Sequence, residues 1–252
     1  MGTRERTLLL CMAYPEISQQ YGATVCMAGV TESGELRRIY PVPFDTFREK
    51  NFQKRRWIEY EIAEKGDYRK ESYKIDPDSV EIGGQESYAA VRERIADRTT
   101  TFTELNARQE ADNTSLGFVT PRDVSLTLDQ EEERARYAAR FNEQTTLTGG
   151  SLDIEVLPHH LRYHFRCGEE CPTEHDIMCE DIEIGQLYRR LKREYTDLET
   201  IEAKLQERFV DWMVENRDLY FMVGTHFQHG TWLIISVLYP ERQQNNRITD
   251  FV

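Results

Sequence analysis

The chain has 252 residues, of which 39% are hydrophobic and 31% are charged. This length and composition exclude an intrinsically disordered protein and allow one large domain or two small ones. The longest apolar run, residues 232–239, is far shorter than the roughly 20 residues that cross a bilayer. The apolar stretch at residues 8–13 is too short for a signal peptide. We therefore predict a cytoplasmic protein that does not span a membrane.

The formal net charge is −13, and the basic residues comprise 25 Arg but only 7 Lys. An acidic surface that avoids lysine predicts a protein adapted to high salt, because salt screens the repulsion between its carboxylates. Stability that rises with KCl concentration would agree with this hypothesis.

Residues 1–84 have the pattern of a small β-rich domain. Short strands are predicted at residues 7–13, 24–30, 36–42, 57–62, 72–75 and 79–82. The turn at residues 31–35 contains Gly34 and predicts a hairpin, and residues 76–78 form a second turn signal. Short strands at this spacing predict a barrel-like domain.

A basic surface with aromatic residues is predicted on this domain. Residues 37–70 contain ten basic and six acidic residues, with aromatic residues interleaved. Phosphate attraction combined with base stacking is how single-stranded nucleic acid is often bound. The predicted contacts are Arg37, Arg38, Lys54, Arg55, Arg56, Trp57 and Arg69. The alternative interpretation is that the aromatic residues form the core and the arginines a solvated face.

Residues 85–150 are predicted to be a helical segment that ends in a linker. Apolar positions on one face predict a helix at residues 88–95, and residues 101–104 have the form of a capping box. The highly charged helix at residues 129–142 has little apolar face, so it either lies at the surface or binds a protein partner. Residues 144–151 are the best linker in the chain.

Residues 151–252 are predicted to be an α/β domain held by a metal. Its strands are expected at residues 161–166, 176–179, 218–224 and 232–239, the last two as a central β-hairpin. Asp181 is predicted to cap a helix, and residues 196–199 form a second capping box. The predicted fold class is therefore α+β, with a small N-terminal barrel, helices and a C-terminal α/β part.

Three of the five cysteines lie close together in the second half of the chain. An odd number of cysteines without an export signal argues against disulfides, and clustered cysteines then predict a metal. Structural zinc takes four Cys or His ligands in a tetrahedron. We predict Zn²⁺ bound by Cys167, Cys171, His175 and Cys179, with His164 as the alternative fourth ligand.

Other interpretations of these residues stay open. The cysteines could be free thiols in a loop, or ligands of an iron–sulfur cluster or of a catalytic site. Three protein ligands and one water would make a zinc site hydrolytic. His226 and His229 lie in a predicted hairpin loop, where functional side chains are often displayed. Cys11 and Cys26 lie in apolar runs and are predicted to be buried, inert thiols.

Four segments carry a resemblance to a known family. They are residues 22–30 (GATVCMAGV), 38–44 (RIYPVPF), 180–189 (EDIEIGQLYR) and 221–228 (FMVGTHFQ). The chain resembles, over most of its length, a family of uncharacterised prokaryotic proteins, and its composition is that of a halophilic archaeal member. The resemblance implies a shared fold, no assigned activity, and a metal site that is a local addition.

These patterns together predict a zinc-containing accessory protein that binds single-stranded RNA or DNA through its N-terminal domain. A metal-dependent hydrolase or nuclease is the first alternative, with His226, His229 or His164 near the metal. The second alternative is an adaptor without chemistry that binds a protein through residues 129–142.

Overall fold

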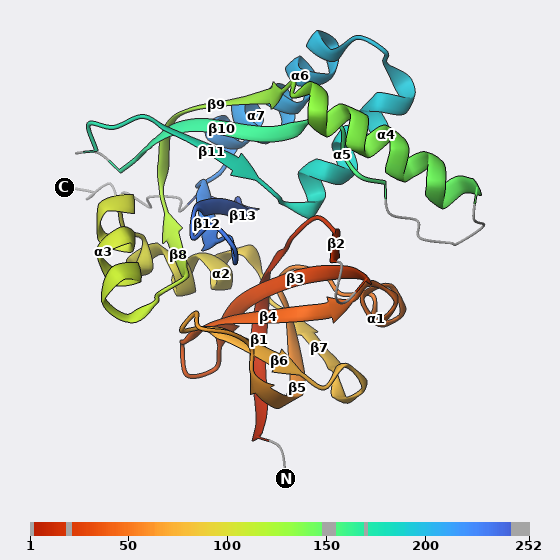
Figure 1. Cartoon of the computed structure of the whole chain (residues 1–252). Coiled ribbons are helices and arrows are strands. Elements are labelled where there is room, and N and C mark those ends of the chain that lie inside the picture. The colour runs from red at the N-terminus through yellow and green to blue at the C-terminus, as the bar shows by residue number, and fades with distance from the viewer. Residues whose placement is uncertain (1–2, 19–21, 148–154, 169–170, 243–252) are drawn as a thin grey trace, which may run out of the picture.

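The computed structural model describes residues 3–18, 22–147, 155–168 and 171–242. Its strands form two sheets, one below the other in Figure 1, with helices at their edges. The linker predicted at residues 144–151 is wrong for residues 144–147, which belong to the helix α4 (Glu132–Leu147). Its other residues, 148–151, lie outside the described residues, as does the chain beyond residue 242. Within the described ranges, no helix combines the length and the apolar character needed to cross a bilayer.

The lower sheet is a closed barrel. Its strands are β1 (Thr3–Met12), β3 (Gly22–Thr31), β4 (Leu36–Pro43), β5 (Arg56–Lys65) and β6 (Ser72–Ile75). They are hydrogen-bonded in the order β1-β3-β4-β6-β5, and β5 also pairs with β1, which closes the barrel. β4 and β6 are parallel, and the other neighbours are antiparallel. The short strands β2 (Glu16–Ser18) and β7 (Glu81–Gln85) pair with β3 and β5.

The local sequence explains this barrel well. The predicted hairpin is β3 and β4, and Gly34 in its turn has a φ of 89°, a left-handed conformation that glycine adopts without strain. β1 and β3 are buried along most of their length because one face lines the barrel and the other meets the second sheet. The connections contain α1 (Phe44–Lys50) and the 3₁₀ turn η1 (Pro77–Ser79).

Three helical elements connect the two sheets. They are α2 (Tyr88–Ile95), η2 (Ala96–Arg98) and α3 (Phe102–Asp112). The predicted cap of α3 is confirmed, since Thr101 Oγ1 accepts a hydrogen bond of 3.3 Å from the amide of Glu104. α3 lies at the side of the upper sheet (Figure 1).

The upper sheet closes in the same way. Its strands are β8 (Leu116–Val119), β9 (Pro121–Asp129), β10 (His160–Cys167), β11 (His175–Cys179), β12 (Tyr220–Thr225) and β13 (Trp232–Leu238). They are hydrogen-bonded in the order β8-β12-β13-β11-β10-β9. The two edge strands, β8 and β9, are separated by the single residue Thr120 and form one bent strand. The sheet is therefore a second barrel, and the predicted central hairpin is its β12 and β13.

The two barrels share one topology. Counted within each barrel, the strands pair in the order 1-2-3-5-4, and strand 1 also pairs with strand 4. Strands 3 and 5 are parallel in both barrels, and a helix connects strands 3 and 4. This is the connectivity of the oligonucleotide/oligosaccharide-binding (OB) fold. The predicted α+β class and N-terminal barrel are confirmed, and the C-terminal part is a second barrel of the same kind.

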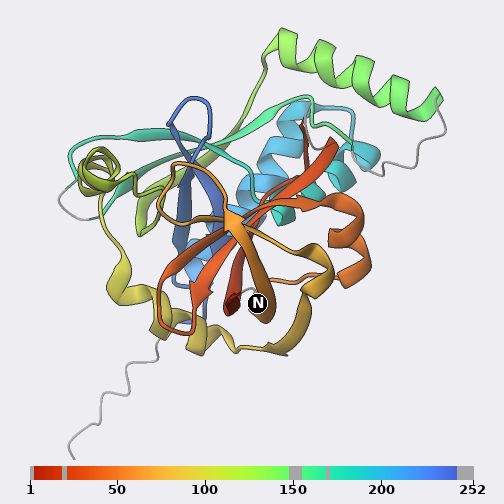
Figure 2. The same ribbon diagram turned by 60° about the horizontal axis from the view of Figure 1, so that its bottom comes forward.

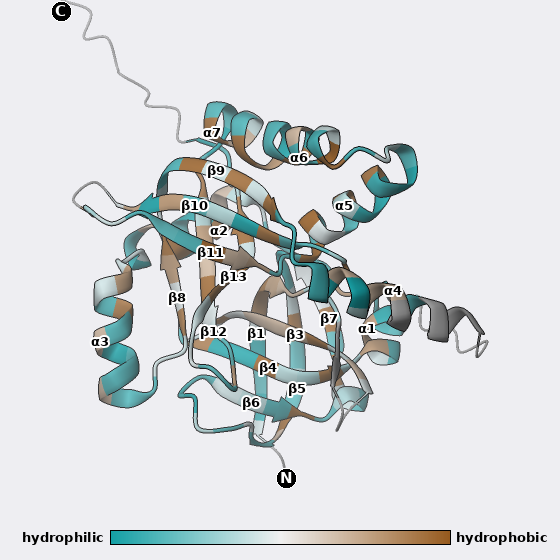
Figure 3. Ribbon diagram, turned by 45° about the horizontal axis from the view of Figure 1, so that its top comes forward, coloured by the Kyte–Doolittle hydropathy of each residue, from teal (hydrophilic) through white to brown (hydrophobic). Residues whose placement is uncertain are grey.

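The second barrel carries longer helical insertions than the first. They are α4 (Glu132–Leu147), α5 (Ile182–Glu194), α6 (Leu198–Gln206), the π-helix η3 (Glu207–Asp211) and α7 (Trp212–Asn216). Asp181 caps α5 as predicted, whereas α6 is capped by Asp197 and not by Thr196. α4 lies at the edge of the molecule in Figure 2, and Figure 3 shows hydrophilic residues along most of its described part.

The barrels are joined by a shared interior. One apolar cluster contains residues of both, including Leu10 and Trp57 from the first and Phe118 and Ile235 from the second. A buried ion pair crosses the same junction, with Lys54 Nζ 2.6 Å from Asp181 Oδ2. Apolar contact and a buried charge pair therefore fix the two barrels against each other.

Candidate metal centre and loop cluster

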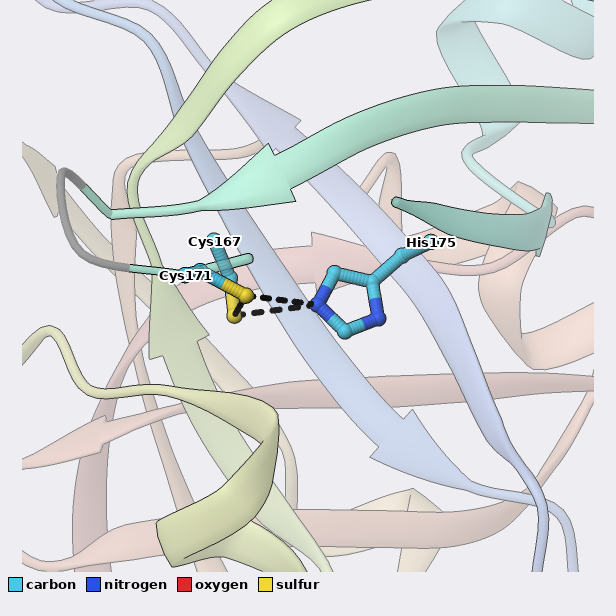
Figure 4. Close-up of side chains that lie close together, drawn as sticks. All are labelled: Cys167, Cys171 and His175. Atoms are coloured by element: carbon cyan, nitrogen blue, oxygen red, sulfur yellow. Dashed lines mark hydrogen bonds between the residues drawn. The ribbon is translucent and has the colours of Figure 1, made fainter. Parts of the chain in front are cut away.

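Three of the predicted metal ligands meet at one end of the β10–β11 hairpin (Figure 4). Cys167 ends β10, His175 begins β11, and Cys171 lies in the loop between them. Cys167 Sγ is 3.1 Å and Cys171 Sγ 3.4 Å from His175 Nε2, and the two sulfurs are 3.4 Å apart. Ligands of a tetrahedral zinc lie about 3.5–3.8 Å apart, given Zn–S and Zn–N bonds of about 2.3 and 2.0 Å. A zinc ion would fit between the two sulfurs and the imidazole nitrogen if these atoms moved apart by a few tenths of an ångström.

The local backbone accounts for this convergence. Gly168 has a φ of 91° and its amide donates to the carbonyl of Thr120, so the chain turns sharply just after Cys167. The amide of Phe102 donates to Cys167 Sγ, and the ring of Phe102 lies 4.6 Å from that of His175. The start of α3 therefore covers one side of the group.

The electrostatics of the group suit a metal. Burial lowers the pKa of His175, which favours the neutral imidazole that coordinates metals. Burial raises the pKa of Cys167. Burial opposes ionisation of Cys171 too, but hydrogen bonds with the Thr173 backbone and the Cys167 thiol lower its pKa overall. Cys171 is thus the thiol that ionises first, and a cation would draw the proton from Cys167.

Cys179 and His164, the two predicted candidates for a fourth ligand, are not brought into this group. Cys179 shares a strand face with His175, but four residues of strand span roughly 13 Å. It lies in the apolar core, 4% exposed. His164 instead hydrogen-bonds through Nε2 to Thr127 Oγ1 at 2.9 Å. The described residues thus supply three ligands, and residues 169–170 of the same loop lie outside the described part of the chain.

The structure also brings together the loops between strands 4 and 5 of both barrels. These loops cover residues 66–71 and 226–231. The ring centroids of Tyr68 and Phe227 are 5.9 Å apart, and Tyr68 Oη donates to the carbonyl of Phe227 at 3.1 Å. Both side chains are 53% exposed, so both rings are accessible to a ligand.

Cationic and imidazole groups surround this aromatic pair. The guanidinium of Arg69 lies 5.6 Å from the Phe227 ring and donates to the carbonyl of Thr225. The rings of His226 and His229 stack at 4.8 Å. Burial first, and then the charges of His229 and Arg69, lower the pKa of His226. Tyr68, Arg69, His226, Phe227 and His229 are called the loop cluster below.

α3 connects the metal group to the loop cluster. Its first residue, Phe102, contacts His175 as described above, and Asn106 Oδ1 accepts from Trp232 Nε1 at 2.8 Å. One turn further along, Gln109 Nε2 donates to the carbonyl of Gly230 at 2.8 Å. A single helix therefore contacts both the β10–β11 hairpin and the β12–β13 loop.

The seven residues predicted to bind nucleic acid lie mostly inside the molecule. Arg37, Arg38, Lys54, Trp57 and Arg69 are all less than 10% exposed. Arg37 forms a bidentate pair with Glu5, and the guanidinium of Arg38 donates to the carbonyl of Ser115. Arg55 and Arg56 are partly exposed. The structure brings Arg69 to the loop cluster, where it supports the Phe227 ring, and does not gather the seven on one surface.

Sequence reasoning did not single out Tyr68 and Phe227 as contact residues. Each is an aromatic residue beside glycine, aspartate or histidine in a predicted loop, which is the signal that could have marked them. Their proximity depends on how the two barrels pack, which no local pattern contains.

Comparisons with known proteins agree with the two-barrel description. One family model, described as Domain of unknown function (DUF8758), matches residues 3–99, which contain the first barrel. None of the curated proteins matches the chain. A second model matches residues 98–251, more than half of the chain and all of the second barrel. The chain therefore belongs to the family described as Domain of unknown function (DUF8757), in agreement with the predicted resemblance to an uncharacterised family.

Proposed function

We propose that the protein is a zinc-containing accessory protein that binds single-stranded nucleic acid at the loop cluster. The observation that carries this proposal is the exposed pair of Tyr68 and Phe227, placed where equivalent loops of two OB barrels meet. In OB-folds the loop between strands 4 and 5 is one of the elements that bind oligonucleotides. Bases stack on exposed aromatic rings with little sequence preference.

The surroundings of the pair support a nucleic-acid ligand over a protein ligand. Arg69 and Lys70 follow Tyr68 directly, and Lys65 Nζ donates to both of their carbonyls. Lys70 is 57% exposed although it pairs with Asp112. Cations beside stacking rings combine phosphate attraction with base contact. Arg69 also pairs with Asp67 at 2.7 Å, so stacking on the two exposed rings contributes the main attraction for a strand.

Zinc is the metal that best fits the Cys167–Cys171–His175 group. Thiolate and imidazole ligands select zinc over magnesium or calcium, which prefer oxygen. Bound there, the ion would clamp the β10–β11 hairpin and hold His175 against Phe102. Because α3 starts at Phe102 and holds the β12–β13 loop, the metal would also fix the loop cluster.

The nucleic-acid part is tested by fluorescence anisotropy with labelled 12-mers of single-stranded RNA and DNA, at several KCl concentrations. Stacking contributes about 1–3 kcal/mol per base. Tyr68→Ala and Phe227→Ala should therefore each weaken binding about fivefold to 150-fold. Tyr137→Ala is the matched control, because Tyr137 is also exposed, at 45%, but lies on α4. No binding at the lowest salt that keeps the protein folded, or equal affinities of all three variants, would refute the proposal.

A metal-dependent hydrolase is the second candidate function, and the three described ligands favour it. Catalytic zinc commonly has three protein ligands and an open position for water. If the site is hydrolytic, Cys171→Ser should abolish turnover of a nucleic-acid or ester substrate that the purified, zinc-loaded protein cleaves. If the protein binds one zinc ion per chain but cleaves no such substrate, the zinc has a structural role and the hydrolase function is rejected.

A further inference from the structure

A pocket of about 430 Å³ lies at the junction of the two barrels, away from the loop cluster. The first half of the chain contributes α1, the segment after it and the start of α2, and the second half contributes α5, the end of β13 and the residues after it. Its volume falls in the range of small-molecule sites, which form preferentially between domains. None of the loop-cluster residues lines it.

The walls of the pocket are largely aromatic. Phe47 and Phe52 stack with ring centroids 5.7 Å apart. Tyr88 and Tyr239 form a second pair with centroids 5.8 Å apart. Aromatic walls of this kind suit a planar ring.

Basic side chains line this pocket in a chain that is strongly acidic. Arg48, Lys54 and Arg55 line the pocket together with one carboxylate, that of Glu183. Lys54 is already paired, because its Nζ lies 2.6 Å from Asp181 Oδ2 and 3.3 Å from Glu183 Oε2. The charge of Lys54 is therefore compensated within the wall of the pocket.

Arg55 is the cation that this arrangement leaves for a ligand. Among the described residues, no carboxylate forms an ion pair with it. Its guanidinium lies 3.9 Å above the Tyr88 ring and donates to the carbonyl of Glu86 at 2.7 Å. A stacked guanidinium with free donors recognises phosphate or carboxylate groups.

The backbone of Arg55 strengthens this interpretation. Its φ is 68°, a left-handed conformation that is strained for a residue with a side chain. The strained position is held by two backbone hydrogen bonds of 2.7 Å, from its amide to Leu9 and from the amide of Glu86 to its carbonyl. Glycine would adopt this conformation without strain, so the arginine side chain has a reason to be there.

We propose that the pocket between the barrels binds a free mononucleotide, with its base between the aromatic walls and its phosphate at Arg55. The ligand chemistry is a planar aromatic ring joined to one anionic group, as in a nucleoside monophosphate. The 5′-phosphorylated end of a strand has the same chemistry, and the experiment distinguishes the two sources.

Titration calorimetry on the full chain, with AMP and UMP as probes, tests the proposal. AMP should bind at least tenfold more tightly than adenosine, which lacks the anion, and than ribose 5-phosphate, which lacks the base. Equal binding of adenosine and AMP would overturn the role of Arg55. So would the absence of heat with both nucleotides at millimolar concentration. Binding of a 5′-phosphorylated oligonucleotide without binding of AMP would overturn the assignment to a free nucleotide.

Substitutions separate binding from folding. Arg55→Gly removes the guanidinium and relieves the left-handed strain, so affinity for AMP should fall about tenfold to 100-fold without loss of fold. Asp123→Gly is the matched control, because Asp123 has a φ of 52° and lies outside the pocket lining. Gln186→Trp, on the exposed face of α5 at the pocket, should block binding by filling it. If both Arg55→Gly and Gln186→Trp bind AMP like the unmodified protein, the proposal is wrong.

The loop cluster provides the remaining control. A Tyr68→Ala/Phe227→Ala protein should bind AMP with unchanged affinity, because neither side chain lines the pocket. Failure of nucleic-acid binding at the loops and failure of nucleotide binding in the pocket are therefore distinguishable.

Discussion

Removal of the Asp181 carboxylate should destabilise the protein more than any ordinary helix-cap substitution. Asp181 is fully buried, and its Oδ2 accepts from Lys54 Nζ at 2.6 Å, from Val237 N at 2.7 Å and from Ser236 Oγ at 3.1 Å. Its Oδ1 accepts from the amide of Glu183 and caps α5. Asp181→Ala would leave a buried ammonium without its main partner and a buried amide without an acceptor.

The magnitude follows from these contacts. Breaking a buried ion pair by removing one partner costs about 3–5 kcal/mol, and a lost helix cap costs about 1 kcal/mol. Glu183 remains 3.3 Å from Lys54 Nζ and partly compensates it, so we expect the lower part of this range, about 3–4 kcal/mol in total. That is a large fraction of the roughly 5–15 kcal/mol by which domains of this size are stable.

The assay is equilibrium unfolding in urea, followed by circular dichroism. Asp197→Ala is the matched control, because Asp197 caps α6 from an exposed position and has no buried cation, so it should cost about 1 kcal/mol. Lys54→Met combined with Asp181→Ala should be less destabilised than Asp181→Ala alone, since the unpaired charge is gone. If Asp181→Ala and Asp197→Ala lower the free energy of unfolding equally, the Lys54–Asp181 pair contributes nothing to stability and the reasoning is refuted.

Three further outcomes are expected. Mass spectrometry of protein purified without chelator should find about one zinc per chain. The Cys179→Ser variant should retain this zinc and the Cys171→Ser variant should lose it. Retention of zinc by both variants would exclude the site described here. Burial disfavours the charge of Lys54, but Asp181 and then Glu183 outweigh it and raise its pKa well above its ordinary value. The contribution of Lys54 to stability is therefore fully present below the unfolded pKa of about 10.4 and is lost as the pH rises through the folded pKa. The difference in unfolding free energy between the unmodified protein and Lys54→Met should then stay constant from about pH 7 to 10 and shrink only in stronger alkali; a decline near neutral pH would contradict it. Thermal stability should rise with KCl up to molar concentration, and indifference to salt would remove the hypothesis of high-salt adaptation.

Local sequence patterns were sufficient to predict most strands of the first barrel. Alternation and the turn at Gly34 depend on residues close in sequence, and the structure contains both. The same holds for the cap at Thr101 of α3, which follows the first barrel. The second barrel was not predicted from the sequence, because the first strand of that barrel is bent at Thr120 and split into β8 and β9. A long insertion that contains α4 then separates this strand from β10, so the spacing of the strands no longer resembles that of a barrel.

The burial of the cations could not be predicted from neighbouring residues in the sequence. A run of arginines and lysines looks like a surface for phosphates as long as their partners are unknown. The partner of Arg37 lies 32 residues away, at Glu5, and that of Lys54 lies 127 residues away, at Asp181. Only the packed barrels bring these carboxylates to the cations, and burial is tolerable because each charge is then paired. The same limit applies to Cys179, whose spacing from His175 fits a ligand pattern but whose strand carries it into the core.

The helix α3 lies between the metal group and the loop cluster, and it contacts the metal group and the loops that carry the cluster. A metal at Cys167, Cys171 and His175 would hold the imidazole against Phe102, and Phe102 begins the helix whose Asn106 and Gln109 hold the β12–β13 side of the loop cluster. The other end of this helix, at Asp112, pairs with Lys70 in the β5–β6 loop. Both loops therefore depend on one rigid helix, and the metal group contacts its N-terminus. If the loop cluster binds nucleic acid, chelation of the metal should weaken that binding while leaving the pocket at Arg55, which α3 does not line, unchanged.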